Sequence, residues 1–407
     1  MNLPVMLRCF SCCLIAGLIM ACSSETEKTI PEHVNELENV SIHHAGPEEA
    51  GVLTLEPEMD FGETDEVLFT GWINDATVDE QGRVYLVDFR SQKIHAYAPD
   101  GSWLTSIGQE GRGPGEFETI TAIQVENGRV HVLDGRHLKI AVFEWQEDEV
   151  GLVDEFNIDM GQFNRQPGWV EKANEQGWHP RPSGMDLDPD GRYLIRFTDR
   201  SVPVNAVLEG RTTNVTRYDP DSRSFTDLDV MAFYWTGQVI VHEVEGAMSV
   251  YFGLGYKRDS RIAYRDGQWV YGWNEDFLLR IHDDDGQYLR AVYHSLPNKP
   301  LVKDDLLQLN ADRGSQFEEM IRNDELPETW PAFQDVFLDR QGRIWVSRIS
   351  EDPETMDWFI LDADGELAGR AQLPSNVRVK YISGDALYAI EQDEDGLAYV
   401  RRYRVEG

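Results

Sequence analysis

The sequence contains almost no cysteine. Four of its 407 residues are cysteines, and all four lie within the first 22 positions, at Cys9, Cys12, Cys13 and Cys22. The body of the chain therefore has no disulfide, no cysteine–zinc cluster and no cysteine nucleophile. Its stability has to come from an apolar core, and 41% hydrophobic and 11% aromatic residues are enough for one large domain or two ordinary ones.

Positive charge is also scarce. The chain has 37 Lys and Arg residues, of which 8 are Lys, against 73 Asp and Glu residues, and its net charge is −36. A nucleic-acid partner is not expected, because binding to a phosphate backbone requires a basic surface. An acidic surface with few lysines fits a saline habitat, in which salt screens self-repulsion, and it fits a genomic bias toward arginine equally well.

A membrane-spanning stretch is missing from the first residues. The apolar run CFSCCLIAGLIM at 9–20 is too short to span a bilayer, but one Arg precedes it and small residues follow, as in a secretory signal. The segment Ile19-Met20-Ala21-Cys22 resembles a bacterial lipobox. This resemblance implies that residues 1–21 are a lipoprotein signal peptide and that Cys22 carries the lipid; the alternative is a plain signal peptide. Ser23 is not the Asp that commonly retains such proteins at the inner membrane, which favours the outer membrane.

Residues 22–50 are polar and acidic, and they are predicted to form a tether between the anchor and a domain that covers 51–407. That domain contains six repeated units, at 78–108, 125–144, 187–228, 264–293, 338–373 and 381–405. In each unit a short strand enters a Gly turn, at positions 82, 128, 191, 267, 342 and 384. The strand after the turn is apolar on both faces, as in 84-VYLV-87, and two further strands follow.

Strands that are apolar on both faces must be covered on both faces, and one four-stranded unit cannot cover itself. The sequence therefore predicts an all-β fold: a six-bladed β-propeller with four-stranded antiparallel blades. The last unit has three clear strands, so residues 51–56 (GVLTLE) are predicted to supply its outer strand and close the ring. Helical spacing of apolar residues predicts a small helical insertion near 303–326.

The segment 108-GQEGRGPGEFETITAIQV-125 resembles the linker of NHL-type propellers. The family's glycines and aromatic residue are matched by Gly108, Gly111, Gly113, Gly115 and Phe117, and its Asp and Lys-Ile pairs by Asp88 with Lys93-Ile94 and Asp134 with Lys139-Ile140. The resemblance is strongest over 71–144 and weakest over 183–293. It implies a six-bladed propeller lipoprotein, and it does not imply one activity.

Long segments interrupt the repeats at 108–118, 159–182, about 231–259 and 296–331, and the propeller topology gathers these segments on one face. They contain Trp169, Trp178, Trp235 and Trp330, which either pack the insertions onto the blades or offer a stacking surface for a sugar or another ring. Polar residues near the starts of the inner strands are expected around the mouth of the channel. From both groups we take these candidate ligand-binding residues: Asn74, Asp75, Arg112, Trp178, Arg258, Asp259, Trp330 and Asp335.

Acidic turns at 188-DPDG-191, 283-DDDG-286, 362-DADG-365 and 393-DEDG-396 suggest calcium, but they lack the alternating ligands and final Glu of an EF-hand loop. We interpret them as hairpin turns. The histidines are scattered, with His95 and His131 in different units, and are interpreted as packing residues. No metal site, catalytic residue or cofactor is predicted, and no Gly-x-Ser-x-Gly motif or phosphate loop is found.

Two functions remain open. The first, and the preferred one, is a non-catalytic, lipid-anchored cell-envelope scaffold that is a monomer and binds a small molecule, a glycan or an envelope protein through its loop-decorated face. The alternative, suggested by some NHL-type propellers, is a metal-dependent hydrolase or lyase with a divalent cation in the central channel.

Overall fold

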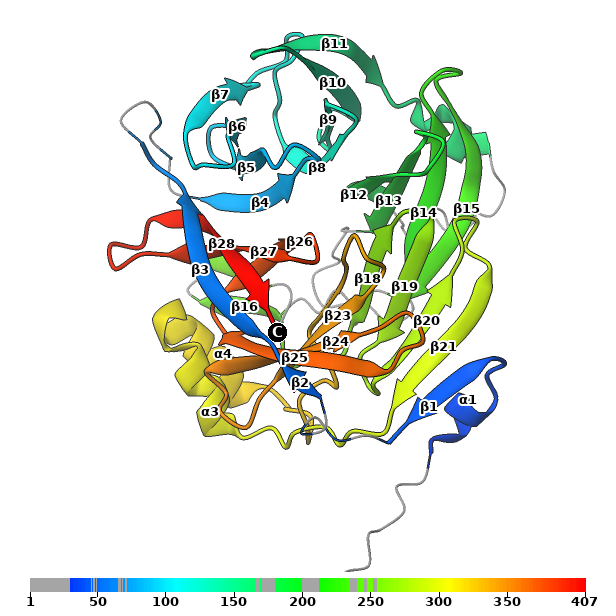
Figure 1. Ribbon diagram of the computed structural model, residues 1–407, viewed down its shortest axis with the longest axis vertical. Helices are drawn as coiled ribbons and strands as arrows, with labels where there is room; N and C mark the ends of the chain where they lie inside the picture. Colours follow the sequence, from blue (N-terminus) through cyan, green and yellow to red (C-terminus); the bar gives the residue numbers. More distant parts are fainter. Residues whose placement is uncertain are drawn as a thin grey trace, which may run out of the picture.

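Six β-sheets, each built on four antiparallel strands, stand around a common axis in the computed structural model (Figure 1), and the predicted six-bladed propeller is confirmed. The structure describes residues 30–407, apart from 45, 47, 49, 65–66, 68, 70–71, 166–168, 170–179, 200–211, 235–239, 245–246 and 252–254. Residues 1–29, with the predicted signal peptide and Cys22, lie outside the described residues.

The first three blades follow one another along the chain, each from the inner strand to the outer. Blade 1 contains β4 (Ile73–Val78), β5 (Val84–Asp88), β6 (Lys93–Tyr97) and β7 (Trp103–Ile107). Blade 2 contains β8 (Ile120–Glu126), β9 (Arg129–Asp134), β10 (Lys139–Gln146) and β11 (Glu149–Asn157). Blade 3 contains β12 (Pro180–Leu187), β13 (Tyr193–Asp199), β14 (Thr212–Asp219) and β15 (Ser224–Tyr234).

The other three blades each borrow a strand from the N-terminal part of the chain. Blade 4 contains β18 (Ser260–Arg265), β19 (Gln268–Trp273), β20 (Leu278–His282), β21 (Tyr288–His294) and β1 (Val40–His43). Blade 5 contains β22 (Asp335–Leu338), β23 (Ile344–Ile349), β24 (Thr355–Leu361), β25 (Leu367–Pro374) and β2 (Gly51–Val52). Blade 6 contains β26 (Arg378–Ile382), β27 (Ala386–Gln392), β28 (Ala398–Glu406) and β3 (Thr54–Phe61).

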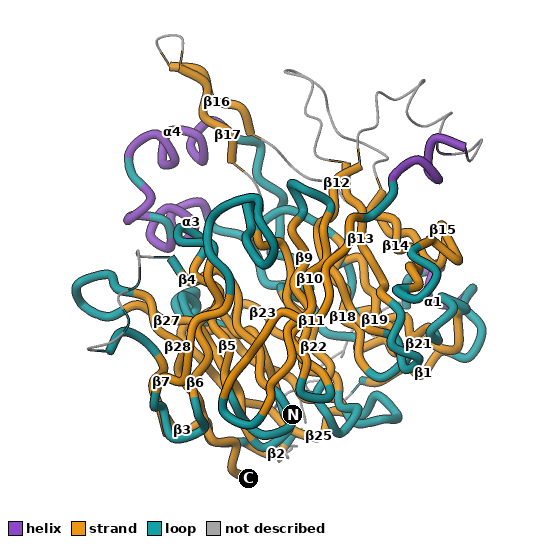
Figure 2. The backbone as a smooth tube through the Cα atoms, turned by 90° about the horizontal axis from the view of Figure 1, so that it is seen from above, coloured by secondary structure: helices purple, strands orange, loops and turns teal. Residues whose placement is uncertain are grey.

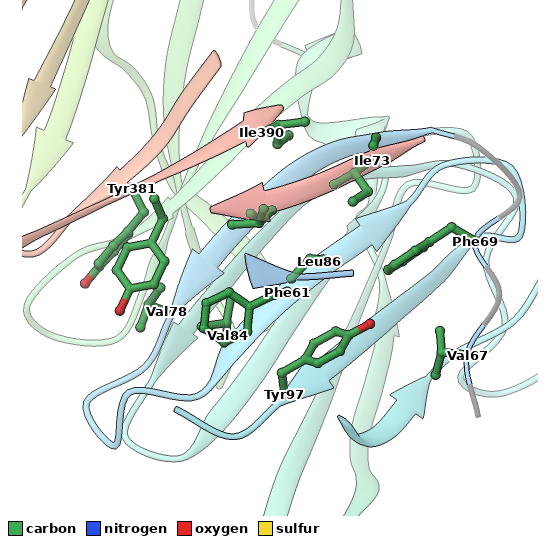
Figure 3. Close-up of a cluster of buried hydrophobic side chains, with 14 of the residues drawn as sticks. Phe61, Val67, Phe69, Ile73, Val78, Val84, Leu86, Tyr97, Tyr381 and Ile390 are labelled. Atoms are coloured by element: carbon green, nitrogen blue, oxygen red, sulfur yellow. The ribbon is translucent and has the colours of Figure 1, made fainter. Parts of the chain in front are cut away.

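Ring closure is made by β3, which pairs antiparallel with β28 from Phe61–Val400 to Thr54–Glu406. The predicted closing segment 51–56 therefore supplies only part of this strand, since residues 51–52 pair with β25 of blade 5 instead. Phe61 is fully buried and its ring lies 6.1 Å from that of Tyr97 and 6.4 Å from that of Tyr388. Figure 3 shows this apolar cluster, which joins the first blade to the last.

Part of the predicted tether packs against the propeller. Residues 30–43 form α1 (Glu32–Asn35) and β1, and β1 runs parallel to β21 from Val40–Ala291 to His43–His294. Val34 is fully buried among side chains of blade 4. The ring of His43 stacks on that of His294 at 4.8 Å. The lead-in is thus fixed to the outer edge of blade 4 from residue 30 onward.

The insertions gather on one face of the ring (Figure 2). They include η2 (Met160–Arg165), the hairpin of β16 (Ile240–Val244) and β17 (Ala247–Tyr251), α3 (Lys303–Leu309), η3 (Ala311–Arg313) and α4 (Ser315–Asn323). The helices α3 and α4 confirm the predicted helical insertion. Among the described residues, no helix is both long enough and apolar enough to cross a membrane.

Candidate functional site

The turn between the first two strands of a blade holds a buried carboxylate. Asp79 accepts hydrogen bonds from the backbone N–H groups of Gln81 and Arg83, from Nε of Arg83 and from the hydroxyl of Tyr85. Asp188 and Asp339 repeat the same arrangement in blades 3 and 5. These acids stabilise the turns of the blades, and both oxygens of each carboxylate already accept hydrogen bonds from the protein.

The acidic turns that suggested calcium are hairpin turns. The first Asp of each turn accepts the backbone N–H groups two and four residues further along, and this holds for Asp188, Asp283, Asp362 and Asp393. Within the described part of the chain, no group of three His, Cys, Asp or Glu side chains is placed to hold a metal ion.

The two strand histidines are packing residues. Burial lowers the pKa of His131 to about 4, and its Nδ1 lies 2.8 Å from the hydroxyl of Tyr193. Nδ1 of His95 lies 2.8 Å from Oγ of Ser106. The Nδ1 atom of each ring therefore has a hydrogen-bonding partner inside the packed propeller.

The predicted ring of polar residues does not converge on one point. Arg258 binds Glu275 at 2.7 Å and the backbone oxygen of Thr329. Asp259 pairs with Arg261 at 3.0 Å, and Asp335 accepts a hydrogen bond from Ser347.

The remaining polar candidates are also dispersed. Arg112 pairs with Glu118 at 2.6 Å. The side-chain oxygen of Asn74 is buried without a hydrogen-bond partner among the described residues. Trp178 lies outside the described residues. Only Asp75 lines the central hollow of the ring, where its carboxylate lies 3.7 Å from Nζ of Lys380.

Trp330 lines a separate cavity between the helical insertion and blade 5, which we call the insertion cavity. Its volume is about 240 Å³. The apolar part of its wall consists of Tyr256, Leu306, Leu309, Phe317, Trp330, Ile349 and Met356. The polar part consists of Asn310, Arg313, Gln334, Ser375 and Asn376.

One charged side chain of the insertion cavity, Arg313, leaves hydrogen-bonding capacity for a ligand, whereas the indole N–H of Trp330 is buried. Trp330 is 3% exposed, and its indole N–H has no hydrogen-bond partner among the described residues. The guanidinium of Arg313 lies 3.8 Å from the ring centre of Phe317 and donates a hydrogen bond to Oδ1 of Asn310 at 3.4 Å. By contrast, Trp169 is buried against Phe163, so the packing interpretation holds for that tryptophan.

The second hollow lies on the axis of the ring and receives residues from the inner strands of all six blades. Its volume is about 590 Å³. We call this space the central hollow. Its charged lining consists of Asp75, Glu80, Glu126, Asp186, Asp266, Arg196, Arg265, Arg340 and Lys380. Arg340 spans part of it, since its guanidinium donates to the hydroxyl of Tyr381 in blade 6 and to the backbone oxygen of Val78 in blade 1.

Most of these lining residues escaped the sequence analysis. Arg196 lies on a second strand, where side chains normally pack between blades, so its position in the hollow was not expected. A signal was present: 193-YLIRFTD-199 places an Arg in an apolar strand, and the neighbouring inner strand 180-PRPSGMDL-187 carries a Gly. The register that brings Gly184 opposite Arg196 includes a bulge, which periodicity alone does not locate.

Comparisons with known proteins agree with this fold. Residues 63–163, which are 101 of the 407 residues, match DUF5128, a family described as a 6-bladed beta-propeller. A protein from Bacteroides fragilis, described as a candidate exported protein, is 12% identical with a TM-score of 0.50, over 90% of this chain and 99% of that one. A DUF4221 family member from Bacteroides vulgatus is 10% identical with a TM-score of 0.50, over 88% and 99%. No curated protein matches the chain. The class is therefore a six-bladed β-propeller.

Proposed function

We propose that this protein is a lipid-anchored binding protein of the cell envelope, which takes a small molecule into the insertion cavity on its loop-decorated face. The observation that carries the proposal is the cavity itself. It is a hollow of about 240 Å³ with a mainly apolar and aromatic wall, it sits on the face that gathers the insertions, and the guanidinium of Arg313 supplies N–H donors to it.

The wall chemistry specifies the class of ligand. Aromatic and aliphatic side chains favour an apolar or ring-shaped body, and a few polar groups at fixed positions orient it. Arg313 donates and carries a positive charge, so the ligand needs an acceptor or an anionic group at one end.

Replacement of Ser375 by Phe tests the insertion cavity. Ser375 lines the cavity from the loop between β25 and β26, so a larger side chain there fills the space while the apolar wall stays intact. We expect the full-length protein, purified in detergent, to bind 1-anilinonaphthalene-8-sulfonate with a fluorescence increase. Ser375→Phe should weaken that binding by about tenfold or more.

Ser222→Phe is the matched control. Ser222 lies in an exposed turn between β14 and β15, so the same substitution there should leave dye binding unchanged. Equal dye affinity in wild type and Ser375→Phe would overturn the proposed binding role of the cavity, and so would a complete lack of dye binding by the wild type.

The anchoring part of the proposal rests on the sequence. Ile19-Met20-Ala21-Cys22 provides the lipid attachment site, and Ser23 favours delivery to the outer membrane. With Cys22 as the anchor, the eight residues 23–30 connect the lipid to the start of the docked lead-in at Ile30.

A further inference from the structure

Arg196 reaches the central hollow by crossing over an inner strand. It lies on β13 opposite Gly184 of β12. A Cβ atom at position 184 would lie 2.3 Å from Nε and from one terminal nitrogen of Arg196, and 2.6 Å from the central carbon of its guanidinium. Only glycine therefore leaves room for this side chain to lie across the strand and line the hollow.

A buried carboxylate holds the Arg196 guanidinium in place. Asp186 is 9% exposed, and its Oδ2 lies 3.2 Å from a terminal nitrogen of Arg196. The amide of Gln124, from blade 2, donates to the other oxygen of Asp186 at 3.3 Å and to the backbone oxygen of Met185 at 2.9 Å. The guanidinium is thus paired with an acid that blade 2 in turn holds in place, which lowers the entropic cost of binding.

The guanidinium of Arg265, also in the hollow, has N–H donors that can bind a ligand. Arg265, at the end of β18, lies over the ring of Tyr381 at 4.9 Å. The structure gives it no hydrogen-bond acceptor among the described residues. Burial raises the pKa of Asp186, while the positive charges of Arg196 and Arg265 oppose that rise. The single carboxylate of Asp186 therefore lies near the guanidinium groups of Arg196 and Arg265. Among these three side chains, positive charge exceeds negative charge, and the N–H donors outnumber the carboxylate oxygens.

Carboxylates also line the hollow, together with Arg340 and Lys380. Glu80, Glu126 and Asp266 line it near the turns that join the first two strands of blades 1, 2 and 4. Burial and the carboxylates of Glu80 and Asp266 raise the pKa of Glu126, and no basic group counteracts this rise. These three carboxylates attract a positive group because an opposite charge stabilises their charged form.

We propose that the central hollow binds a small zwitterion of the amino-acid class, with its carboxylate on Arg196 and Arg265 and its ammonium group toward Glu80, Glu126 and Asp266. Guanidinium groups bind carboxylates through paired, charge-assisted hydrogen bonds. A simple anion meets repulsion from these three acids, and a simple cation meets repulsion from the two arginines, so a ligand with both charges fits these five side chains. This site is separate from the insertion cavity and does not depend on the function proposed for it.

Calorimetry on the full-length protein in detergent tests the proposal, with the free L-amino acids as probes, titrated one at a time. Each amino acid that binds is then compared with its N-acetyl form, which lacks the ammonium charge, and with its amide, which lacks the carboxylate. We expect at least one free amino acid to bind and both modified forms to bind about tenfold or more weakly, as expected when one charge-assisted contact is lost.

Two substitutions test the assigned residues. Gly184→Ala displaces the flexible guanidinium of Arg196, and Arg265→Gln removes the second cation; each should weaken binding by about tenfold or more. Gly151→Ala is the matched control, because a Cβ there meets nothing within 4 Å, and it should bind like the wild type. Ser375→Phe should also bind amino acids normally, which separates this site from the insertion cavity.

Three results would overturn the proposal. The first is that no free amino acid binds. The second is that an N-acetyl form binds as tightly as its parent, since the hollow would then be a simple anion site. The third is that Gly184→Ala and Arg265→Gln, with unfolding transitions like that of the wild type, retain full affinity.

Discussion

Asp79, Asp188 and Asp339 each hold a turn together with one side chain. Their carboxylates are buried and accept several N–H donors at once, and their nearest partners lie two and four residues further along the chain. Such short-range chemistry is readable from sequence, because the partners are in the motif itself. The support of Arg196 is different, since Gln124 and Asp186 are 62 residues apart and meet only when two blades pack.

At this scale we predict a large loss of stability for Asp339→Ala. The substitution leaves the backbone N–H groups of Gln341 and Arg343, the guanidinium of Arg343 and the indole N–H of Trp345 without their acceptor. Breaking a buried pair of this kind costs roughly 3–5 kcal/mol. Urea unfolding followed by tryptophan fluorescence measures the loss.

Asp364→Ala is the control for this substitution. Asp364 is exposed in the turn at 362–365, and a surface change of this kind alters stability by about 0.5 kcal/mol or less. Similar unfolding midpoints for the two variants would contradict the structural role assigned to Asp339.

Among the elements, those of the blades were predictable and the lead-in was not. A Gly turn followed by a doubly apolar strand recurs six times, and the apolar spacing over 303–326 predicts the helical pair. Residues 23–50 are polar and acidic, so composition alone predicts a tether. Their docking depends on a few apolar side chains, such as Val34, Val40 and Ile42, which meet a complementary edge on blade 4. A single sequence shows neither that edge nor its register.

The docked lead-in should loosen in acid. Burial lowers the pKa of His294 to about 4, and the adjacent His43 contributes to the lowering. The folded pKa lies below the usual value of about 6.5, so folding excludes a proton that the unfolded state accepts, and undocking of β1 removes the part of this effect that β1 and His43 provide. The stabilising contribution of this contact is complete above about pH 6.5 and falls as the pH drops toward about 4.

Hydrogen exchange of the β1 amides, corrected for intrinsic rates, measures this effect. Protection should be lower at about pH 5 than at about pH 7 in the wild type, because His294 then favours the undocked state. In His294→Gln, which has no titrating ring, the difference should shrink. An equal loss of protection in both proteins would mean that His294 does not control the docking.

At the scale of the whole molecule, the ring is sealed by its N-terminal segment, and three of the six blades contain a strand from it. Closure by β3 was predictable in kind, because the last unit lacks a strand and an open edge is unfavourable. The extra edge strands β1 and β2 were not, since no unit lacks them. The fold therefore follows from repetition along the chain, whereas the two hollows depend on side chains from separate blades.

The whole-molecule prediction concerns the anchor. In a bacterial host supplied with radiolabelled palmitate, the wild type should carry the label and sediment with the outer membrane. Cys22→Ala should lose the label, and Cys13→Ala should keep it, because Cys13 lies in the part predicted to be removed. Label retained by Cys22→Ala, or absent from the wild type, would contradict lipidation at Cys22.

The docking of β1 on the outer edge of blade 4 determines at which point of the propeller a lipid anchor would be attached. Eight residues span at most about 29 Å when fully extended, so an anchor at Cys22 would keep the outer edge of blade 4 within about that distance of the bilayer. The lipid would thus be attached at the outer rim of the ring, and neither the face with the insertion cavity nor the axis with the central hollow would carry the attachment.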